Sequence, residues 1–121
     1  MSKAPSSSAS QYVYLWTFQV KPGCEAQFEK TYGPTGEWVR LFQKAAGYLR
    51  TELLRDRAVP GRYLTIDYWE SEQSHRQFRQ KSEAEFHQLD KRCEDLTESE
   101  GLVGHFAVVP PPGSDGQAGD S

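Results

Sequence analysis

The stretch YVYLWTFQV, residues 12–20, restricts the possible folds more than any other part of the sequence. Its aromatic and β-branched residues favour a β-strand, whose side chains point alternately to opposite faces of a sheet. A strand with one face in water would alternate apolar and polar residues. Here one face would carry Tyr12, Tyr14, Trp16, Phe18 and Val20, and the other Val13, Leu15, Thr17 and Gln19. Both faces are largely apolar, so both need a cover.

Two regions show the spacing of amphipathic helices. In the first, an apolar residue recurs every fourth position from Cys24, Gly33-Pro34 breaks the helix, and Thr35 caps a second piece that ends at Gly47. In the second, Ser71 caps a long helix with a kink near Ser82, closed by Gly101. The apolar faces are Cys24, Phe28, Tyr32, Trp38, Leu41, Phe42 and Ala45, then Phe78, Ser82, Phe86, Leu89, Cys93 and Leu96.

Three further strands complete the pattern. Residues 48–56 and 62–69 flank the turn sequence AVPG and form a hairpin, and residues 102–109 form the last strand. The order β-α-β-β-α-β is the split βαβ, or ferredoxin-like, arrangement. We therefore predict an α+β fold, with a four-stranded antiparallel sheet that carries its helices on one face.

The two ends differ in composition from the rest of the chain. Residues 1–10 (MSKAPSSSAS) and 110–121 (PPPGSDGQAGDS) contain too few apolar residues to offset the entropy of ordering. We expect disordered tails there and one domain over residues 11–109. A docking role for the Pro triplet is the alternative for the second tail.

Composition excludes several classes of function. The formal net charge of -3 lacks the basic surplus of nucleic-acid-binding modules. No run of 18 apolar residues exists to cross a membrane, and the first residues lack the apolar core of a secretory signal. Cys24 and Cys93 form no CxxC pair, so we expect reduced thiols in the cytoplasm. Three scattered histidines lack the spacing of a metal site.

The sheet face that the helices leave uncovered predicts a partner. The last strand is also apolar on both sides, with Val103, Ala107 and Val109 opposite Phe106 and Val108. A monomer would expose a larger apolar patch than soluble monomers usually tolerate. Packing of the sheet against a second copy gives a homodimer. The alternative is that long Arg and Lys side chains cover this face.

Three groups of residues resemble the antibiotic biosynthesis monooxygenase family, one of the dimeric α/β-barrel families. They are Lys21-Pro22-Gly23 with Phe28, then Gly47-Tyr48 leading into Thr51-Glu52-Leu53, then residues 62–69 (RYLTIDYW) with Ser71 and Phe78. The resemblance covers nearly all of residues 11–109. It implies the same dimeric fold and an activity among those of the family, which include cofactor-independent oxygenases of polyketide aromatics, quinol oxygenases, haem-degrading enzymes and isomerases.

The resemblance also implies a pocket between the sheet and the helices, with an aromatic lining that suits a planar ligand. Trp69 matches the family's tryptophan at the end of the third strand. Trp16 stands where haem-degrading members have asparagine, and Phe78 where catalytic relatives have histidine or tryptophan, which argues against haem degradation. We predict that Tyr14, Trp16, Trp69 and Phe78 bind a small aromatic molecule without a cofactor. The alternative is that these rings pack on one another and leave no cavity.

Two residues are candidates for a catalytic base. His87 follows Phe86 on the helix stripe, where an imidazole could flank the pocket and act as a base, although it is also placed as an ordinary helix-side histidine. Asp67 lies mid-strand, beside Glu52 on the neighbouring strand of the hairpin. Each of these acids either pairs with Arg50 or Arg62 or, if buried, has a raised pKa that suits a general base.

Three other reactive residues have structural interpretations. We expect His75, in the first turn of its helix, to be solvated. His105 shares strand parity with Val103 and is expected to be buried or at an interface. Cys24 begins a helix, where the helix dipole favours a thiolate, but it also fits the apolar stripe and is expected to fill the core.

The residues and the resemblance together favour a cofactor-independent monooxygenase of a small phenolic or quinol-type substrate. Such a protein would deprotonate the substrate in a dry aromatic pocket, and the electron-rich anion would reduce dioxygen. The alternative is a non-catalytic dimer of the same fold that binds a small planar molecule or serves as an interaction module.

Overall fold

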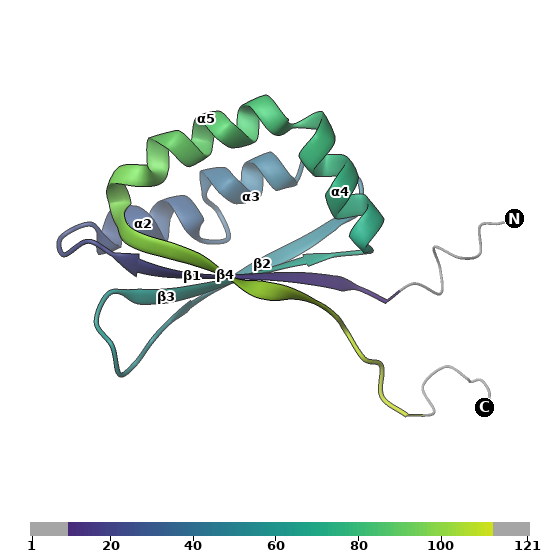
Figure 1. The fold of residues 1–121 in the computed structure, drawn as a ribbon, viewed down its shortest axis with the longest axis horizontal. Helices are drawn as coiled ribbons and strands as arrows, with labels where there is room; N and C mark the ends of the chain where they lie inside the picture. The colour runs from purple at the N-terminus through teal and green to yellow at the C-terminus, as the bar shows by residue number, and fades with distance from the viewer. Residues whose placement is uncertain (1–9, 113–121) are drawn as a thin grey trace, which may run out of the picture.

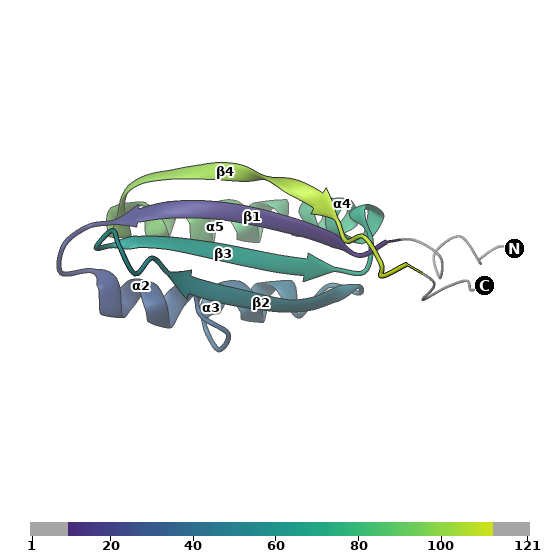
Figure 2. The same ribbon diagram turned by 90° about the horizontal axis from the view of Figure 1, so that it is seen from below.

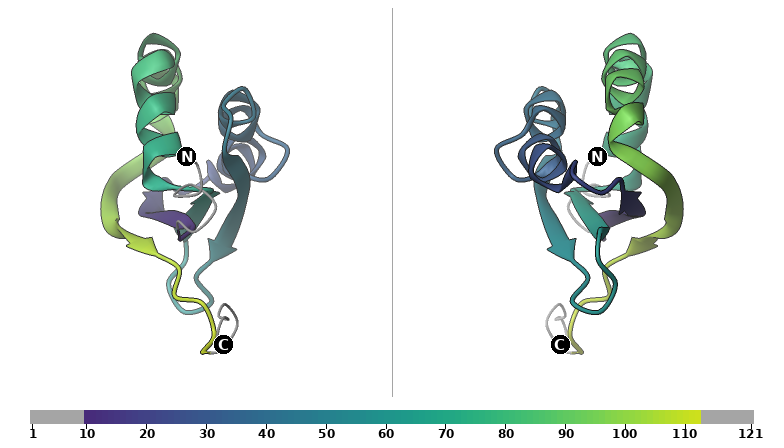
Figure 3. Two further views of the ribbon diagram at one scale, coloured as in Figure 1. Left: turned by 90° about the vertical axis from the view of Figure 1, so that its right-hand side faces the viewer. Right: turned by 90° about the vertical axis from the view of Figure 1, so that its left-hand side faces the viewer.

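Four strands form one antiparallel sheet in the order β2-β3-β1-β4. The computed structural model describes residues 10–112. The strands are β1 (Tyr12–Val20), β2 (Tyr48–Arg55), β3 (Arg62–Trp69) and β4 (Thr97–Ala107). The helices are α2 (Glu25–Tyr32), α3 (Glu37–Phe42), α4 (Glu72–Lys81), α5 (Glu83–Cys93) and the short 3-10 helix η1 (Glu94–Leu96). All of them lie over the same face of the sheet, in two rows (Figures 1 and 3). The predicted ferredoxin-like α+β fold is confirmed.

The aromatic strand β1 lies in the middle of the sheet, between β3 and β4 (Figure 2). Its helix-side residues meet the helix-side residues of β3, with Tyr14 opposite Asp67 and Trp16 opposite Thr65. Its other face, which includes Val13 and Leu15, looks away from the helices. The helices therefore cover only one of the two apolar faces of this strand.

The core forms where helix α2 meets the strands. Phe28 is completely buried and its ring stacks on Tyr32 at 4.2 Å between centroids. Phe18 of β1 meets the edge of Phe28 at 5.2 Å. A fully buried side chain of this size contributes roughly 1.5–3 kcal/mol to stability. This cluster fixes one end of the helical layer on the sheet.

The second helical region begins and breaks where the sequence predicts. The Ser71 hydroxyl accepts a hydrogen bond from the Ser74 backbone N–H at 3.1 Å, which is the geometry of a helix N-cap. The region then divides into α4 and α5 at Ser82. The break lets α4 cross the sheet in a different direction from α5 (Figure 1).

Several boundaries predicted from the sequence are wrong. Helix α3 ends at Phe42 and not at Gly47, and strand β4 ends at Ala107 and not at residue 109. Helix α3 is capped by Gly36 and not by Thr35; a side chain at Gly36 would collide with the Thr31 carbonyl. Strand β4 begins at Thr97 and not at residue 102, so Gly101 lies inside the strand. The segment 97–100 is polar and carries no strand pattern, but an edge strand keeps polar side chains in water while its backbone pairs with β1.

The predicted tails, residues 1–10 and 110–121, lie outside the described residues except for Ser10 and residues 110–112, which are exposed. Within residues 10–112, no helix is long and apolar enough to cross a membrane.

Gly47 controls how the start of β2 approaches helix α4. Its φ is +92°, and an added Cβ would lie 2.6 Å from the Ser74 Cβ. Gly23 has a φ of +90° with no atom within 4 Å of an added Cβ. Both Gly→Ala changes cost roughly 1–2 kcal/mol for the backbone, but Gly47→Ala adds an overpacking cost of about 1–3 kcal/mol. Urea denaturation should show the larger loss for Gly47→Ala; equal losses would contradict this.

Candidate functional site

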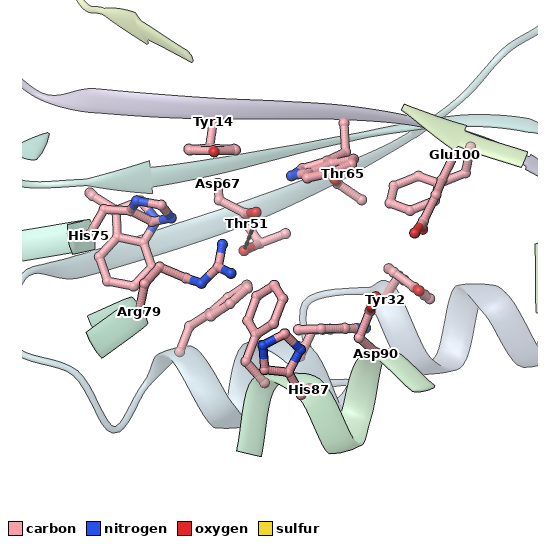
Figure 4. Close-up of a pocket in the computed structure, with 16 residues that line it drawn as sticks. Tyr14, Tyr32, Thr51, Thr65, Asp67, His75, Arg79, His87, Asp90 and Glu100 are labelled. Carbon is pink, nitrogen blue, oxygen red and sulfur yellow. Dashed lines mark hydrogen bonds between the residues drawn. The ribbon is translucent and has the colours of Figure 1, made fainter. Parts of the chain in front are cut away.

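A cavity of about 280 Å³ lies between the sheet and the helices. Strands β1, β2, β3 and β4 and helices α2, α3, α4 and α5 all contribute to its wall (Figure 4). Most of the wall is aromatic, which is the surface expected for a flat apolar ligand.

Three of the four residues predicted to bind a substrate line this cavity: Tyr14, Trp16 and Trp69. Phe78 does not. It is buried behind the wall, with its ring 5.3 Å from the centroids of both Trp69 and Phe42. On helix α4 the neighbouring positions His75 and Arg79 face the cavity instead, so the stripe residue packs into the core.

Asp67 is a buried acid in the wall of the cavity. Its Oδ1 accepts a hydrogen bond from the Thr51 hydroxyl at 2.6 Å, and the Thr51 hydroxyl lies 2.7 Å from the Tyr48 hydroxyl. Burial raises the pKa of Asp67 to about 6, against the opposing effect of the Thr51 hydrogen bond. At neutral pH the carboxylate predominates but is easily protonated, as a general base requires.

The sequence leaves two interpretations open for the hairpin acids, an ion pair with Arg50 or Arg62 or burial with a raised pKa. For Asp67 the structure shows burial. Arg50 approaches Glu52 instead, at 3.9 Å, and Arg62 approaches Asp56 at 3.6 Å. Glu52 is exposed and also accepts from the Tyr68 hydroxyl. The two acids differ because Asp67 points to the helix side of the sheet, whereas Glu52 points to the open side with Tyr68.

The expectation that His75 is solvated is wrong. Its ring lines the cavity, 4.5 Å from the Tyr14 ring and 5.2 Å from the Trp69 ring. Burial, together with the positive charge of Arg79 and the nearby His105, lowers the pKa of His75 to about 4. The imidazole is therefore neutral at physiological pH, with one N–H to donate and one nitrogen to accept.

The other two histidines are less enclosed. His87 borders the cavity, but 65% of its side chain is exposed and it lies 3.7 Å from Glu83. His105 lies opposite Tyr14 on the edge strand β4; it is exposed and not buried as one expectation had it. Among residues 10–112, no three His, Cys, Asp or Glu side chains are grouped to hold a metal ion.

Arg79 is a cavity residue that the sequence analysis did not identify. Its guanidinium carbon lies 3.9 Å from the centre of the Phe86 ring. Its Nε is buried and has no hydrogen-bond partner among the described residues, and the same holds for Trp69 Nε1. The only sequence signal was its position one turn after His75, on the same side of α4.

The sequence matches the model of the antibiotic biosynthesis monooxygenase family over residues 12–89, which is more than half of the chain. The chain belongs to this family. The resemblance of the three residue groups to the family is thus confirmed. No curated protein matches this chain significantly.

Several solved structures share the fold of this chain. A variant of SnoaB, a cofactor-independent oxygenase from Streptomyces nogalater, is 20% identical with a TM-score of 0.66, over 86% of this chain and 98% of that chain. A candidate antibiotic biosynthesis monooxygenase from Bordetella bronchiseptica is 24% identical with a TM-score of 0.65, over 84% and 99%. A MhuD variant with two manganese protoporphyrin IX bound per active site is 21% identical with a TM-score of 0.64, over 83% and 96%.

The raised pKa of Asp67 has a consequence for stability. The folded protein binds the Asp67 proton more tightly than the unfolded chain, so the charged carboxylate destabilises the fold above pH 6 and the penalty vanishes below pH 4. Asp67→Asn removes the charge and keeps an acceptor for Thr51. We expect it to stabilise the protein by up to about 3 kcal/mol at pH 8, with the gain declining towards pH 4. Urea denaturation at several pH values measures this; a gain that does not change with pH would contradict it.

Proposed function

We propose that this protein is a cofactor-independent monooxygenase of a small phenolic or quinol-type aromatic. The observation that carries the proposal is a single buried carboxyl, Asp67, in the wall of an aromatic cavity, with a pKa raised to about 6. Membership of the antibiotic biosynthesis monooxygenase family supports the reaction class. SnoaB, which has the same fold, is described as a cofactor-independent oxygenase.

The cavity suits a flat substrate. Trp16, Trp69 and Tyr14 offer ring faces and edges on which an aromatic ligand stacks, each contact contributing about 0.5–1.5 kcal/mol beyond burial. A flat ligand stacked in this cavity would displace water from it, which strengthens every hydrogen bond to the ligand.

Asp67 would remove a proton from the substrate hydroxyl. The pKa of an ordinary phenol is about 10, so the transfer is uphill and the phenolate must be stabilised as it forms. Trp69 Nε1 and the neutral His75 ring are donors in the wall of the same cavity, and Trp69 Nε1 lacks an acceptor among residues 10–112. Preorganised donors of this kind are the usual means of stabilising an oxyanion.

The substrate anion supplies the electrons for dioxygen. A quinol ring loses two hydrogen atoms and gains one oxygen atom, giving a hydroxyquinone, while the second oxygen atom of O₂ and the two hydrogen atoms leave as water. All four electrons that reduce O₂ come from the substrate, so the balance needs no other reductant. The protein contributes the base, the donors and the exclusion of water.

The proposal includes a homodimer that packs through the open face of the sheet. Leu15, Leu64 and Ile66 are only half-buried on this face, and Phe106 is 51% exposed. No helix of residues 10–112 covers this face (Figure 2). The proposal places the dimer in the cytoplasm, because Cys24 and Cys93 are both free thiols.

A non-catalytic binding module is the second candidate function. It is favoured by Trp16 and Phe78, because the resemblance implies asparagine at the first position in haem-degrading members and histidine or tryptophan at the second in catalytic relatives. In that case the cavity would bind a planar molecule, and Asp67 would serve only to hydrogen-bond it.

Oxygen uptake with a panel of quinols and anthrones tests the proposal. We expect one O₂ consumed per substrate, with kcat/KM rising as the pH passes about 6 and level above it, because the carboxylate is the active form. Asp67→Asn should lower kcat by about 100-fold or more. His87→Gln tests the other candidate base and should keep both the rate and the pH profile.

Two results would contradict the proposal. The absence of uptake with every quinol and anthrone, in protein that binds them, would favour the non-catalytic module. A rate lost in His87→Gln but kept in Asp67→Asn would assign the base to the exposed histidine.

The dimer has its own test. Light scattering at micromolar concentration should give twice the 13.8 kDa chain mass. Leu15→Lys should give the monomer mass, since an unpaired ammonium would be buried between the sheets. Val59→Lys, which adds the same charge at an exposed turn, should stay dimeric. A monomeric wild-type protein would overturn the dimer.

A further inference from the structure

We propose that Arg79 is the anion-binding residue of the cavity and that the substrate is a hydroxylated aromatic acid, held by its carboxylate at Arg79 and by its hydroxyl at Asp67. This inference rests on the proposed function insofar as it takes the ligand to be a hydroxylated aromatic. It adds the charge and the orientation of that ligand.

The guanidinium of Arg79 is held in place with its hydrogen-bonding edge unused. Its central carbon lies 3.9 Å from the centre of the Phe86 ring. This contact holds one face of the guanidinium and uses none of its N–H groups. Its Nε is buried without a hydrogen-bond acceptor in the described part of the chain. A buried donor left unpaired is costly, so an acceptor supplied by a ligand gains more here than at the surface.

Neighbouring arginines on the helices are paired. Arg76, one turn before Arg79, lies 3.1 Å from Glu72, and Arg92 on α5 lies 3.0 Å from Glu37. Asp67, which shares the cavity with Arg79, receives its hydrogen bond from Thr51. Within residues 10–112, no acid lies within ion-pair distance of Arg79, so its charge is available to a ligand.

The charged side chains of the cavity are separated by sign along its length. Arg79 and His75 lie at one end, and Asp90 and Glu100 at the other (Figure 4). Burial and the charges of Asp90 and Glu94 raise the pKa of Glu100 above its ordinary value. A ligand carboxylate is repelled from the acidic end and attracted to Arg79, which sets the direction in which an aromatic acid enters.

The carboxylate is the group that fits this edge. Arg presents two parallel N–H donors that match the two oxygens of a carboxylate, and such charge-assisted pairs are roughly twice as strong as neutral hydrogen bonds. An ester or an unsubstituted ring of the same shape fills the cavity but leaves Arg79 unpaired. The preference for acid over ester therefore measures the contribution of Arg79.

Calorimetric titration with 1-hydroxy-2-naphthoate and with its methyl ester tests the inference. Neither compound is a quinol, so binding is measured apart from turnover. At pH 8 we expect the wild-type protein to bind the acid about tenfold or more tightly than the ester. Arg79→Gln should bind the two alike, and Arg79→Lys should keep part of the preference. The matched control Arg76→Gln, at the exposed arginine of the same helix, should keep all of it.

Equal affinity for acid and ester in the wild-type protein would overturn the inference, as would no binding of either compound or a preference that survives in Arg79→Gln. Near-UV circular dichroism checks that each variant is folded. If Arg79→Gln is not, Arg79→Lys decides: an undiminished preference in it contradicts the specific fit of the guanidinium.

The two proposals fail separately. A protein that prefers the acid through Arg79 but consumes no oxygen keeps this inference and loses the monooxygenase function. An active oxygenase that binds acid and ester alike keeps the function and loses the aromatic acid.

Discussion

The need to cover the aromatic face of β1 determines most of this structure. Tyr12, Phe18 and Val20 at the two ends of the strand are buried, whereas Tyr14 and Trp16 between them remain partly accessible. The helices pack closely at the ends, through Phe28 against Phe18 on one side and Phe78 against Trp69 of β3 on the other. The space that is left over the middle of the strand is the cavity. A core built from large flat rings leaves such a gap where two helices diverge.

The polar groups of the cavity follow from strand register. Tyr14, Asp67 and Thr51 lie side by side on β1, β3 and β2, so the acid, its hydrogen-bond donor and an aromatic ring meet on one row of the sheet. Helix α4 then places His75 and Arg79 on the opposite wall. Burial acts on Asp67 and His75 in opposite senses, raising the pKa of the acid and lowering that of the imidazole. A largely ionised carboxylate with a raised pKa and a neutral imidazole thus face one cavity, an arrangement typical of acid–base sites.

The sequence predicted the elements that depend on local chemistry and missed those that depend on how elements meet. The Ser71 cap, the break at Ser82 and the strand β1 follow from residue type and spacing. His75 was expected to be solvated and Arg79 was not identified, because both flank the apolar stripe of their helix, whereas in the structure both line the cavity. Phe78 was assigned to the cavity wall because it lies on that apolar stripe, but the stripe packs into the core. Asp67 was identified, but whether it was buried or ion-paired depended on which face of the sheet the helices cover.

The central claim is that Asp67 is a buried acid poised to accept a proton. A carbon-13 NMR titration of the side-chain carboxyls, with Asp67→Asn used to assign the signal, tests it without any substrate. We predict that the Asp67 carboxyl titrates with a pKa of about 6. A pKa near 4, the ordinary value of a solvated aspartate, would contradict it.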